Sequence, residues 1–289
     1  MPGLTTRFAP SPNGELHLGH AFAAITAHDF ARRNKGAFLL RIEDIDGTRS
    51  RPELVQGIID DLQWLGLGWD GEPLFQSQRI ARYDAALHRL ADAGLAYPCF
   101  CTRSQIAAAQ AHKPAATGPD GPVYPGTCRD LPAGERQRRR EAEPHCWRLD
   151  TARAMDRAGP LYWCDLDAGE QLARPGLFGD VIIARKDAPA SYHLAATLDD
   201  AADGISHVVR GRDLFAATHV HRLLQALFGL PTPLYLHHAL LAGPDGRKLS
   251  KSLGSAALSV LRRAGVNGRD LADDIRNNRL PAGISVMAD

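Results

Sequence analysis

Hydrophobic positions near the start of the chain follow strand and helix periods in turn. Leu4–Ala9 and Ala37–Ile42 are short apolar runs of strand length, and Leu18–Asn34 between them has helical spacing and stops before a glycine. Further helices are expected from about Arg51 and over Gln78–Ala93. This alternation predicts an α/β fold, a Rossmann-like parallel sheet with helices on both faces that binds ligands at the carboxyl ends of its strands.

The alternation is lost over 97–179, where Pro- and Gly-rich loops surround short helical pieces. It resumes with strands expected at Asp180–Arg185, Ile205–Val209 and Leu234–His238, and with helices expected from Ser191 and over Asp213–Phe228. We therefore predict a sheet domain interrupted by a smaller insertion. The predicted boundaries are 1–96 and 180–240 for the two halves of the sheet domain, 97–179 for the insertion, and 241–289 for a lysine-containing loop and a C-terminal helical region.

Composition narrows the class of protein. A chain of 289 residues with 44% hydrophobic content can bury a sizeable core. Its apolar runs are far shorter than the roughly 18 residues of a membrane helix, and its start lacks the apolar segment of a signal peptide, so we expect a cytoplasmic protein without membrane association. A net charge of +1 does not favour a general nucleic-acid binder. The basic run from Arg136 to Arg140 fits either a solvated helix face or a local RNA contact.

The stretch PSPNGELHLGH, from Pro10 to His20, joins the first expected strand to the first helix. Its prolines and glycine form a turn, and His17 and His20 then lie about one turn apart on the same helix face. Both imidazoles can point at one ligand, and the helix N-terminus favours phosphate. Taken alone, such a stretch is explained more simply by two incidental helix histidines.

A second stretch, PDGRKLSKS from Pro244 to Ser252, supports the interpretation of the first stretch as a phosphate site. A tight turn precedes Lys248 and Lys251, whose ammonium groups lie three residues apart on a loop of small residues that can close over a triphosphate. Lysine suits this role because it is a compact point charge. A phosphate site with contacts from both ends of an α/β sheet is far more specific than either stretch alone.

With these two stretches the chain resembles the class I aminoacyl-tRNA synthetases, HLGH matching their HIGH element and KLSKS their KMSKS element. RFAPSPNGELHLGHA followed by LLRIEDIDGTRS is similar to the glutamyl and glutaminyl branch. The length and the cysteine-bearing insertion are similar to the glutamyl-queuosine tRNA(Asp) synthetases, truncated paralogues in that branch. The resemblance implies binding of ATP with Mg²⁺ by His17, His20 and Lys251, and catalysis by these three residues with Lys248.

Charged residues at expected strand ends suit glutamate as the amino acid. Arg7 and Arg210 each end a strand, and a planar guanidinium can grip a carboxylate with two hydrogen bonds. By resemblance these arginines hold the side-chain carboxylate of L-glutamate and Glu43 holds its amine. From the residues alone, arginines at strand ends are equally well surface salt-bridge partners. The glutamate site implied by the resemblance consists of Arg7, Ala9, Ser11, Glu43, Tyr192 and Arg210.

The insertion carries a CxC…YxxxC arrangement whose thiolates and phenolate suit a tetrahedral zinc site. The four residues are Cys99, Cys101, Tyr124 and Cys128. By resemblance they bind one structural Zn²⁺ per chain, whereas spacing alone leaves His112 or His145 as substitutes for Tyr124. The chain has five cysteines, an odd number that argues against a disulfide framework, and Cys146 and Cys164 are expected to be buried or incidental.

The implied reaction begins with attack of the glutamate α-carboxylate on the α-phosphate of ATP, and an RNA hydroxyl then attacks the adenylate. The residues after Ser252 are too few for the large anticodon-binding region of an ordinary glutamyl-tRNA synthetase. We therefore expect a monomer that forms the adenylate without tRNA and glutamylates the queuosine of the tRNA(Asp) anticodon. The alternatives are a minimal synthetase that charges the 3′ end of tRNA(Glu), and a non-catalytic regulator that binds a nucleotide or RNA.

Overall fold

The computed structural model describes residues 3–112, 116–249 and 257–287. Its N-terminal sheet contains the parallel strands β1 (Thr5–Phe8), β2 (Ala37–Ile42) and β3 (Leu74–Phe75), in the order β1-β2-β3. The side chains of β2 alternate between two faces. Phe38, Leu40 and Ile42 are fully buried in a core with α1 (Leu18–Arg33), whereas Arg41 points to the opposite face, toward α7 (Tyr192–Ala202).

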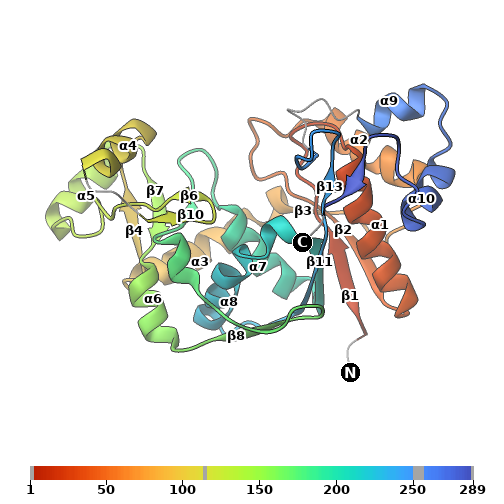
Figure 1. The fold of residues 1–289 in the computed structure, drawn as a ribbon. Coiled ribbons are helices and arrows are strands. Elements are labelled where there is room, and N and C mark those ends of the chain that lie inside the picture. The colour runs from red at the N-terminus through yellow and green to blue at the C-terminus, as the bar shows by residue number, and fades with distance from the viewer. Residues whose placement is uncertain (1–2, 113–115, 250–256, 288–289) are drawn as a thin grey trace.

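The second half of the sheet adjoins the first at its centre. Strand β11 (His207–Gly211) lies beside β1, where the Ser206 backbone N–H donates to the Thr5 carbonyl at 3.0 Å (Figure 1). Strands β12 (Leu234–His238) and β8 (Tyr162–Asp165) continue in parallel, and β9 (Gly169–Leu172) closes the edge in the antiparallel sense. The predicted Rossmann-like parallel sheet is confirmed.

Helices cover both faces of this sheet, as predicted. Helix α1 packs on one face with α10 (Gly268–Arg276), while α7 and α8 (Ala217–Phe228) lie on the other. Helix α8 starts later than expected because Arg212–Leu214 form a separate 3-10 turn, η3. The remaining helices of this domain are α2 (Pro52–Trp64), the 3-10 turn η1 (Gln76–Arg79) with α3 (Ile80–Asp92), α6 (Thr151–Ala158), the 3-10 turn η2 (Pro175–Phe178) and α9 (Leu258–Arg263).

The middle of the chain forms a separate antiparallel sheet of order β10-β7-β4. Strand pairing crosses the predicted boundaries of the insertion, which stay a prediction. The run expected as a strand of the parallel sheet forms β10, which pairs with β7, whereas β8 and β9 from 97–179 belong to the parallel sheet. An apolar run does not specify its pairing partner. The elements of this part are β4 (Ala96–Cys99), α4 (Arg103–His112), β5 (Thr117–Gly118), β6 (Gly121–Pro122), α5 (Ala133–Ala142), β7 (Cys146–Leu149) and β10 (Ile182–Ala184).

The C-terminal part returns to the first half of the sheet domain. Strand β13 (Leu241–Ala242) pairs with β14 (Ser285–Val286), and α9 packs against α2 (Figure 1). Among the described residues, no helix combines the length and the apolar character needed to cross a bilayer.

Candidate functional site

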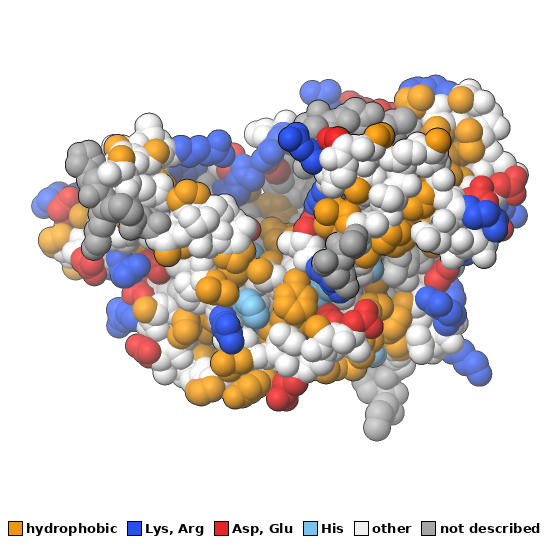
Figure 2. Space-filling model, viewed as in Figure 1, with side chains coloured by type: hydrophobic (Ala, Val, Ile, Leu, Met, Phe, Trp, Pro, Cys, Tyr) orange, Lys and Arg blue, Asp and Glu red, His pale blue; other side chains and the backbone are white. Residues whose placement is uncertain are grey.

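A cavity of about 1120 Å³ opens at the carboxyl ends of β1, β2 and β11. Figure 2 shows the molecular surface hollowed between the part with α4 and α5 and the part with α9 and α10, and Lys and Arg side chains line the upper rim of this hollow. Lys251, a predicted catalytic residue, lies outside the described residues. The cavity brings together all the other residues predicted for catalysis and for glutamate binding: Arg7, Ala9, Ser11, His17, His20, Glu43, Tyr192, Arg210 and Lys248.

The two histidines are oriented by the start of α1. His17 is the N-cap of this helix, and its Nδ1 accepts the Gly19 backbone N–H at 3.1 Å. The Nδ1 of His20 accepts the His17 backbone N–H, also at 3.1 Å, and the two ring centroids lie 3.8 Å apart. A ring nitrogen that accepts a hydrogen bond carries no proton, so both imidazoles are neutral with the proton at Nε2. Such a pair can donate two hydrogen bonds to one anion.

Arg7 lines the cavity and forms a buried ion pair with Asp200. Its Nε and Nη2 donate to the two carboxylate oxygens of Asp200 on α7, at 2.9 and 3.2 Å, and Arg41 donates to the same carboxylate at 2.8 Å. Burial would raise the pKa of Asp200, but Arg7 and Arg41 hold it at about 2. The charge of Arg7 is therefore shared with a protein carboxylate, and its Nη1 is the nitrogen without a hydrogen-bond partner among the described residues.

Arg210 at the end of β11 is surrounded by neutral acceptors. It donates to Tyr192 Oη at 3.0 Å, to Thr218 Oγ1 at 2.7 Å and to His237 Nε2 at 3.1 Å. Burial and the charge of Arg210 lower the pKa of His237 to about 4, and they also lower that of the neighbouring His221. No carboxylate of the described residues forms an ion pair with Arg210, although its exposure is only 6%. A buried, uncompensated guanidinium at a cavity wall is suited to an anionic ligand.

Glu43 is the acidic group on the same wall. It follows β2, and Ser11 Oγ lies 3.4 Å from its Oε2. Burial raises the pKa of Glu43 to about 7, although Arg41 and Arg7 oppose this shift, and Asp200 adds to it. Because a nearby cation would restore the ionised form, this carboxyl is suited to an ammonium group.

The described start of the second motif is anchored to the sheet. Lys248 bridges to Ala242 through the backbone, and its Nζ forms an ion pair with Asp213, another residue of the cavity. Leu249 is buried in the core with α1. Pairing with β13 thereby holds one motif lysine at the cavity.

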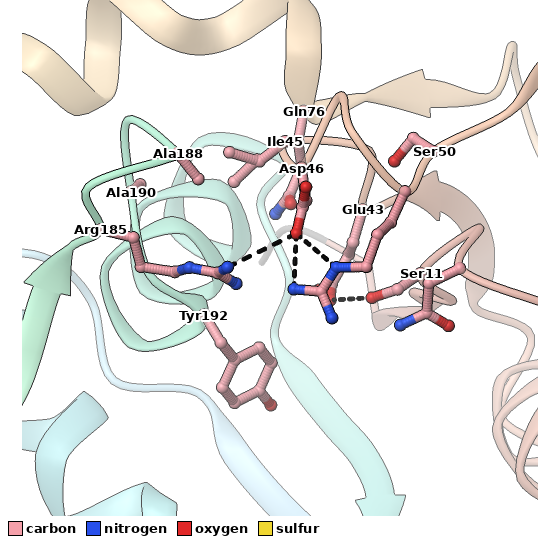
Figure 3. Close-up of a pocket in the computed structure, with 12 residues that line it drawn as sticks. Ser11, Glu43, Ile45, Asp46, Ser50, Gln76, Arg185, Ala188, Ala190 and Tyr192 are labelled. Carbon is pink, nitrogen blue, oxygen red and sulfur yellow. Dashed lines mark hydrogen bonds and ion pairs between the residues drawn. The ribbon is translucent and has the colours of Figure 1, made fainter. Parts of the chain in front are cut away.

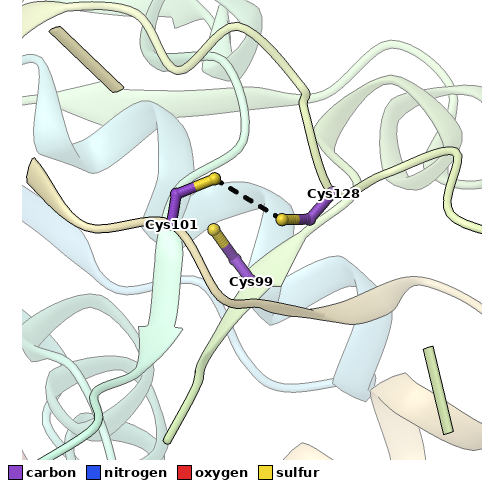
Figure 4. Close-up of side chains that lie close together, drawn as sticks. All are labelled: Cys99, Cys101 and Cys128. Atoms are coloured by element: carbon purple, nitrogen blue, oxygen red, sulfur yellow. Dashed lines mark hydrogen bonds between the residues drawn. The ribbon is translucent and has the colours of Figure 1, made fainter. Parts of the chain in front are cut away.

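The predicted metal ligands also converge (Figure 4). The sulfurs of Cys99, Cys101 and Cys128 lie within 4.8 Å of one another, and those of Cys101 and Cys128 are 3.5 Å apart. Tyr124 Oη lies 3.3 Å from Cys99 Sγ and 3.5 Å from Cys101 Sγ. Zn–S bonds of about 2.3 Å in a tetrahedron bring sulfurs to roughly 3.8 Å, so this donor set fits zinc.

Of the two alternative ligands, His145 is not part of the cluster that the described residues form. His145 packs its ring against Phe100 and Trp147, and its Nδ1 lies 3.1 Å from the Glu143 carbonyl. Cys146 is buried, as expected, and its Sγ lies 3.6 Å from the Cys99 carbonyl oxygen. Cys164 is half-buried and belongs to β8. The side chain of His112 lies outside the described residues.

Sequence reasoning missed the ionic network behind the cavity. Asp199 and Asp200 on α7 and Asp203 at its C-cap form ion pairs with arginines from distant segments, namely Arg7, Arg41 and Arg79. The signal lay in Arg41, which interrupts an apolar strand, and in the paired aspartates of an otherwise apolar helix, since buried charges need partners. Through Arg7, which lines the cavity, the network fixes one wall of the site.

Sequence reasoning also missed a side pocket of about 150 Å³ beside the main cavity (Figure 3). The two share Ser11, Asn13, Glu43, Arg49 and Tyr192. The other residues that line the side pocket are Ile45, Asp46, Ser50, Gln76, Arg185, Ala188 and Ala190.

Comparisons with known proteins show which proteins the chain is similar to. Residues 3–272 match the family model described as tRNA synthetases class I (E and Q), catalytic domain. The chain is 47% identical to a glutamyl-Q tRNA(Asp) synthetase of Rhodobacter capsulatus over 93% of this chain and 98% of that one. It is 40% identical to a glutamate–tRNA ligase of Synechococcus over 92% of this chain but 56% of the ligase. A solved glutamate–tRNA synthetase of Elizabethkingia anophelis superposes with a TM-score of 0.72 at 29% identity, over 87% of this chain and 53% of that one.

Proposed function

Because the chain belongs to the class I tRNA synthetases of glutamate and glutamine, and within them to the glutamyl-Q tRNA(Asp) synthetases, we propose that it activates L-glutamate with ATP and transfers it to the queuosine of the tRNA(Asp) anticodon. The observation that carries the proposal is the single cavity that unites the histidine pair, Lys248 and the acid-free guanidinium of Arg210. These are the groups that a triphosphate and an anionic amino acid require.

In the first step the glutamate side chain binds to Arg210, with a further hydrogen bond from Nη1 of Arg7. The two arginines divide this role unequally, because Asp200 already occupies two nitrogens of Arg7. The ammonium group of the substrate binds Glu43, which ionises as the cation arrives. This arrangement discriminates against glutamine, because an uncharged amide would leave the buried positive charge of Arg210 without a counter-charge.

The α-carboxylate of glutamate then attacks the α-phosphorus of MgATP. A bond forms between the carboxylate oxygen and phosphorus, the bond to the β-phosphate oxygen breaks, and pyrophosphate leaves. The Nε2–H groups of His17 and His20 donate to phosphate oxygens, and Lys248 and Lys251 stabilise the negative charge on the phosphates. No side chain acts as a nucleophile, because positioning and charge stabilisation carry such a displacement.

In the second step a hydroxyl of the acceptor attacks the carbonyl carbon of the adenylate. The carbon–oxygen bond to the phosphate breaks, AMP leaves with the hydroxyl proton, and a glutamyl ester remains on the RNA. We propose that the enzyme acts as a monomer.

We propose that the cysteine cluster holds one structural zinc ion. The thiolates of Cys99, Cys101 and Cys128 and the phenolate of Tyr124 are the ligands. The Arg148 guanidinium packs over the Tyr124 ring, 3.8 Å from its centre, and helps to orient this side chain. A closed zinc site contributes folding energy, here by tying β4 to the loop that carries Tyr124 and Cys128.

Two assays test the function. The first measures glutamate-dependent exchange of pyrophosphate into ATP without tRNA, and its absence would support the non-catalytic alternative. The second measures transfer of labelled glutamate to tRNA(Asp) with and without queuosine, each also prepared without its 3′-terminal nucleoside. We expect tRNA(Asp) to accept glutamate only when it contains queuosine, whether or not its 3′-terminal nucleoside is present. Glutamate on the 3′ end of unmodified tRNA(Glu) would establish the minimal synthetase instead.

A further inference from the structure

The Arg210 guanidinium is connected to a buried carboxylate through a histidine ring. Its Nε–H donates to Nε2 of His237 at 3.1 Å, and Nδ1 of the same ring lies 2.7 Å from Oδ2 of Asp165. His237 is 1% exposed and Asp165 is 2% exposed, and neither is among the described residues that line the two cavities, whereas Arg210 is. The three side chains therefore lead from the protein core to the wall of the main cavity.

The sheet places these side chains next to one another. Arg210 on β11 lies opposite His237 on β12, and Asp165 ends β8, the next strand of the sheet. Oδ1 of Asp165 accepts two backbone N–H groups of the turn between β8 and β9, at 3.0 and 2.9 Å, and Oδ2 also accepts the backbone N–H of His237 at 3.2 Å. The carboxylate is thereby fixed, with one oxygen bound to the turn and the other to β12.

These contacts determine which ring nitrogen of His237 carries the proton. Burial would raise the pKa of Asp165, but the backbone N–H of Ala168 and the hydrogen bond from His237 hold it below its usual value. An ionised carboxylate can only accept, so the Nδ1 that faces it carries the proton. Burial and the charge of Arg210 lower the pKa of His237 to about 4, so the ring is neutral at pH 7 and its Nε2 is a bare acceptor.

A neutral ring between the two charges orients Arg210 without neutralising it. Arg7 shows the other arrangement, because Asp200 binds two of its nitrogens directly. The remaining acceptors around Arg210 are hydroxyl, imidazole and carbonyl groups, all of them neutral. Since the three guanidinium nitrogens are coplanar, the bond at Nε sets the plane of the group and so the direction of Nη1, which donates to Tyr192 at the cavity.

We propose that Asp165 and His237 are positioning residues for the amino-acid substrate: Asp165 fixes the tautomer of His237, and this ring directs the guanidinium of Arg210 toward the side-chain carboxylate of glutamate. This inference rests on the proposed function, in which Arg210 is the main contact of that carboxylate. Neither residue touches a substrate or takes part in a chemical step. Their loss should therefore weaken the binding of glutamate and leave the use of ATP unchanged.

The first test observes the tautomer in the wild-type protein. Long-range ¹H–¹⁵N NMR spectra of protein with ¹⁵N-labelled histidine distinguish a bare ring nitrogen from a protonated one by their ¹⁵N shifts. The ring of His237, assigned through bond correlations to its own backbone, should carry one proton, at Nδ1, at neutral pH. A proton at Nε2, or a doubly protonated ring, would overturn the inference whatever the activity of the protein.

The second test separates KM from kcat. In D165N the turn N–H groups retain the amide oxygen, so the amide nitrogen faces Nδ1 of His237 and forces the ring proton onto Nε2, against the Nε–H of Arg210. The KM for glutamate in pyrophosphate exchange should rise about tenfold or more, while kcat and the KM for ATP stay within about threefold. The matched control is Y235F on the same strand, because the Tyr235 hydroxyl accepts from Gln225 and not from Arg210. It should leave all three values within about twofold.

A third variant tests whether Asp165 acts through the ring. In H237Q the side-chain oxygen can accept from Nε of Arg210 without a carboxylate to fix a tautomer. The KM for glutamate should stay within about threefold of wild type, D165N should raise it no further in this background, and H237L should raise it about tenfold or more. Equal effects of D165N in both backgrounds, or equal losses in H237Q and H237L, would each overturn the inference. Absence of glutamate-dependent exchange in the wild-type protein would instead refute the proposed function.

Discussion

Glu43 occupies a position that disfavours its ionised form. The stability of the protein should therefore depend on pH by an amount that can be calculated. Burial, with Asp200 and Asp199, raises its pKa from 4.5 to about 7 despite the opposing charges of Arg41 and Arg7. One pKa unit corresponds to about 1.4 kcal/mol, so the ionised carboxylate costs the folded protein about 3 kcal/mol above pH 7. We expect the substitution Glu43→Gln to remove this cost.

The sign of the effect follows from proton binding. Between pH 4.5 and 7 the folded protein holds a proton on Glu43 that the unfolded chain has lost, so wild-type stability falls as pH rises through this window. The Glu43→Gln variant lacks this loss. From that pKa, its free energy of unfolding should exceed that of the wild type by about 1 kcal/mol at pH 5 and by about 3 kcal/mol at pH 8.

Thermal unfolding at the two pH values measures the difference. For a chain of this size about 2–4 °C accompany each kcal/mol, so the melting temperature of Glu43→Gln should lie roughly 6–12 °C above wild type at pH 8 and roughly 2–4 °C above it at pH 5. Glutamate activation should fall sharply in the same variant because the ammonium loses its charged partner. A pH-independent difference, or a variant less stable than wild type at pH 8, would refute the reasoning.

Four further changes test other parts of the site. Arg210→Lys should lower kcat/KM for glutamate about 100-fold in pyrophosphate exchange while the KM for ATP stays within about threefold, because an ammonium cannot keep the hydrogen bonds that hold the charge of Arg210 at the cavity wall. Normal glutamate use would exclude this role. Lys251→Ala should slow adenylate formation about 10²-fold, and an unchanged rate would remove this lysine from the mechanism. Purified protein should contain about one equivalent of zinc, and Cys101→Ser should lower it without unfolding the parallel sheet; metal-free protein with full transfer activity would contradict the zinc site. Rising salt should weaken transfer to tRNA much more than adenylate formation, whereas equal sensitivity would argue against phosphate contacts in the transfer step.

Most of the cavity could be predicted from local patterns. The apolar periods placed β1, α1 and β2, and residues at the ends of parallel strands must meet at one edge of the sheet. Arg7, His17 and Glu43 were therefore expected at one edge of the sheet, and all three line the cavity. The cysteine spacing likewise predicted a cluster, because a CxC pair places both thiols on one short segment.

Tertiary structure decided which groups neutralise one another. Arg7 and Asp200 are 193 residues apart, and only their approach across the sheet makes Arg7 a paired arginine and leaves Arg210 as the uncompensated one. The same holds for Asp46 and Arg185, which meet only because the loop after β10 folds toward the end of β2. Periodicity reports which face of an element is buried, whereas charge compensation depends on distances between segments that no local pattern encodes.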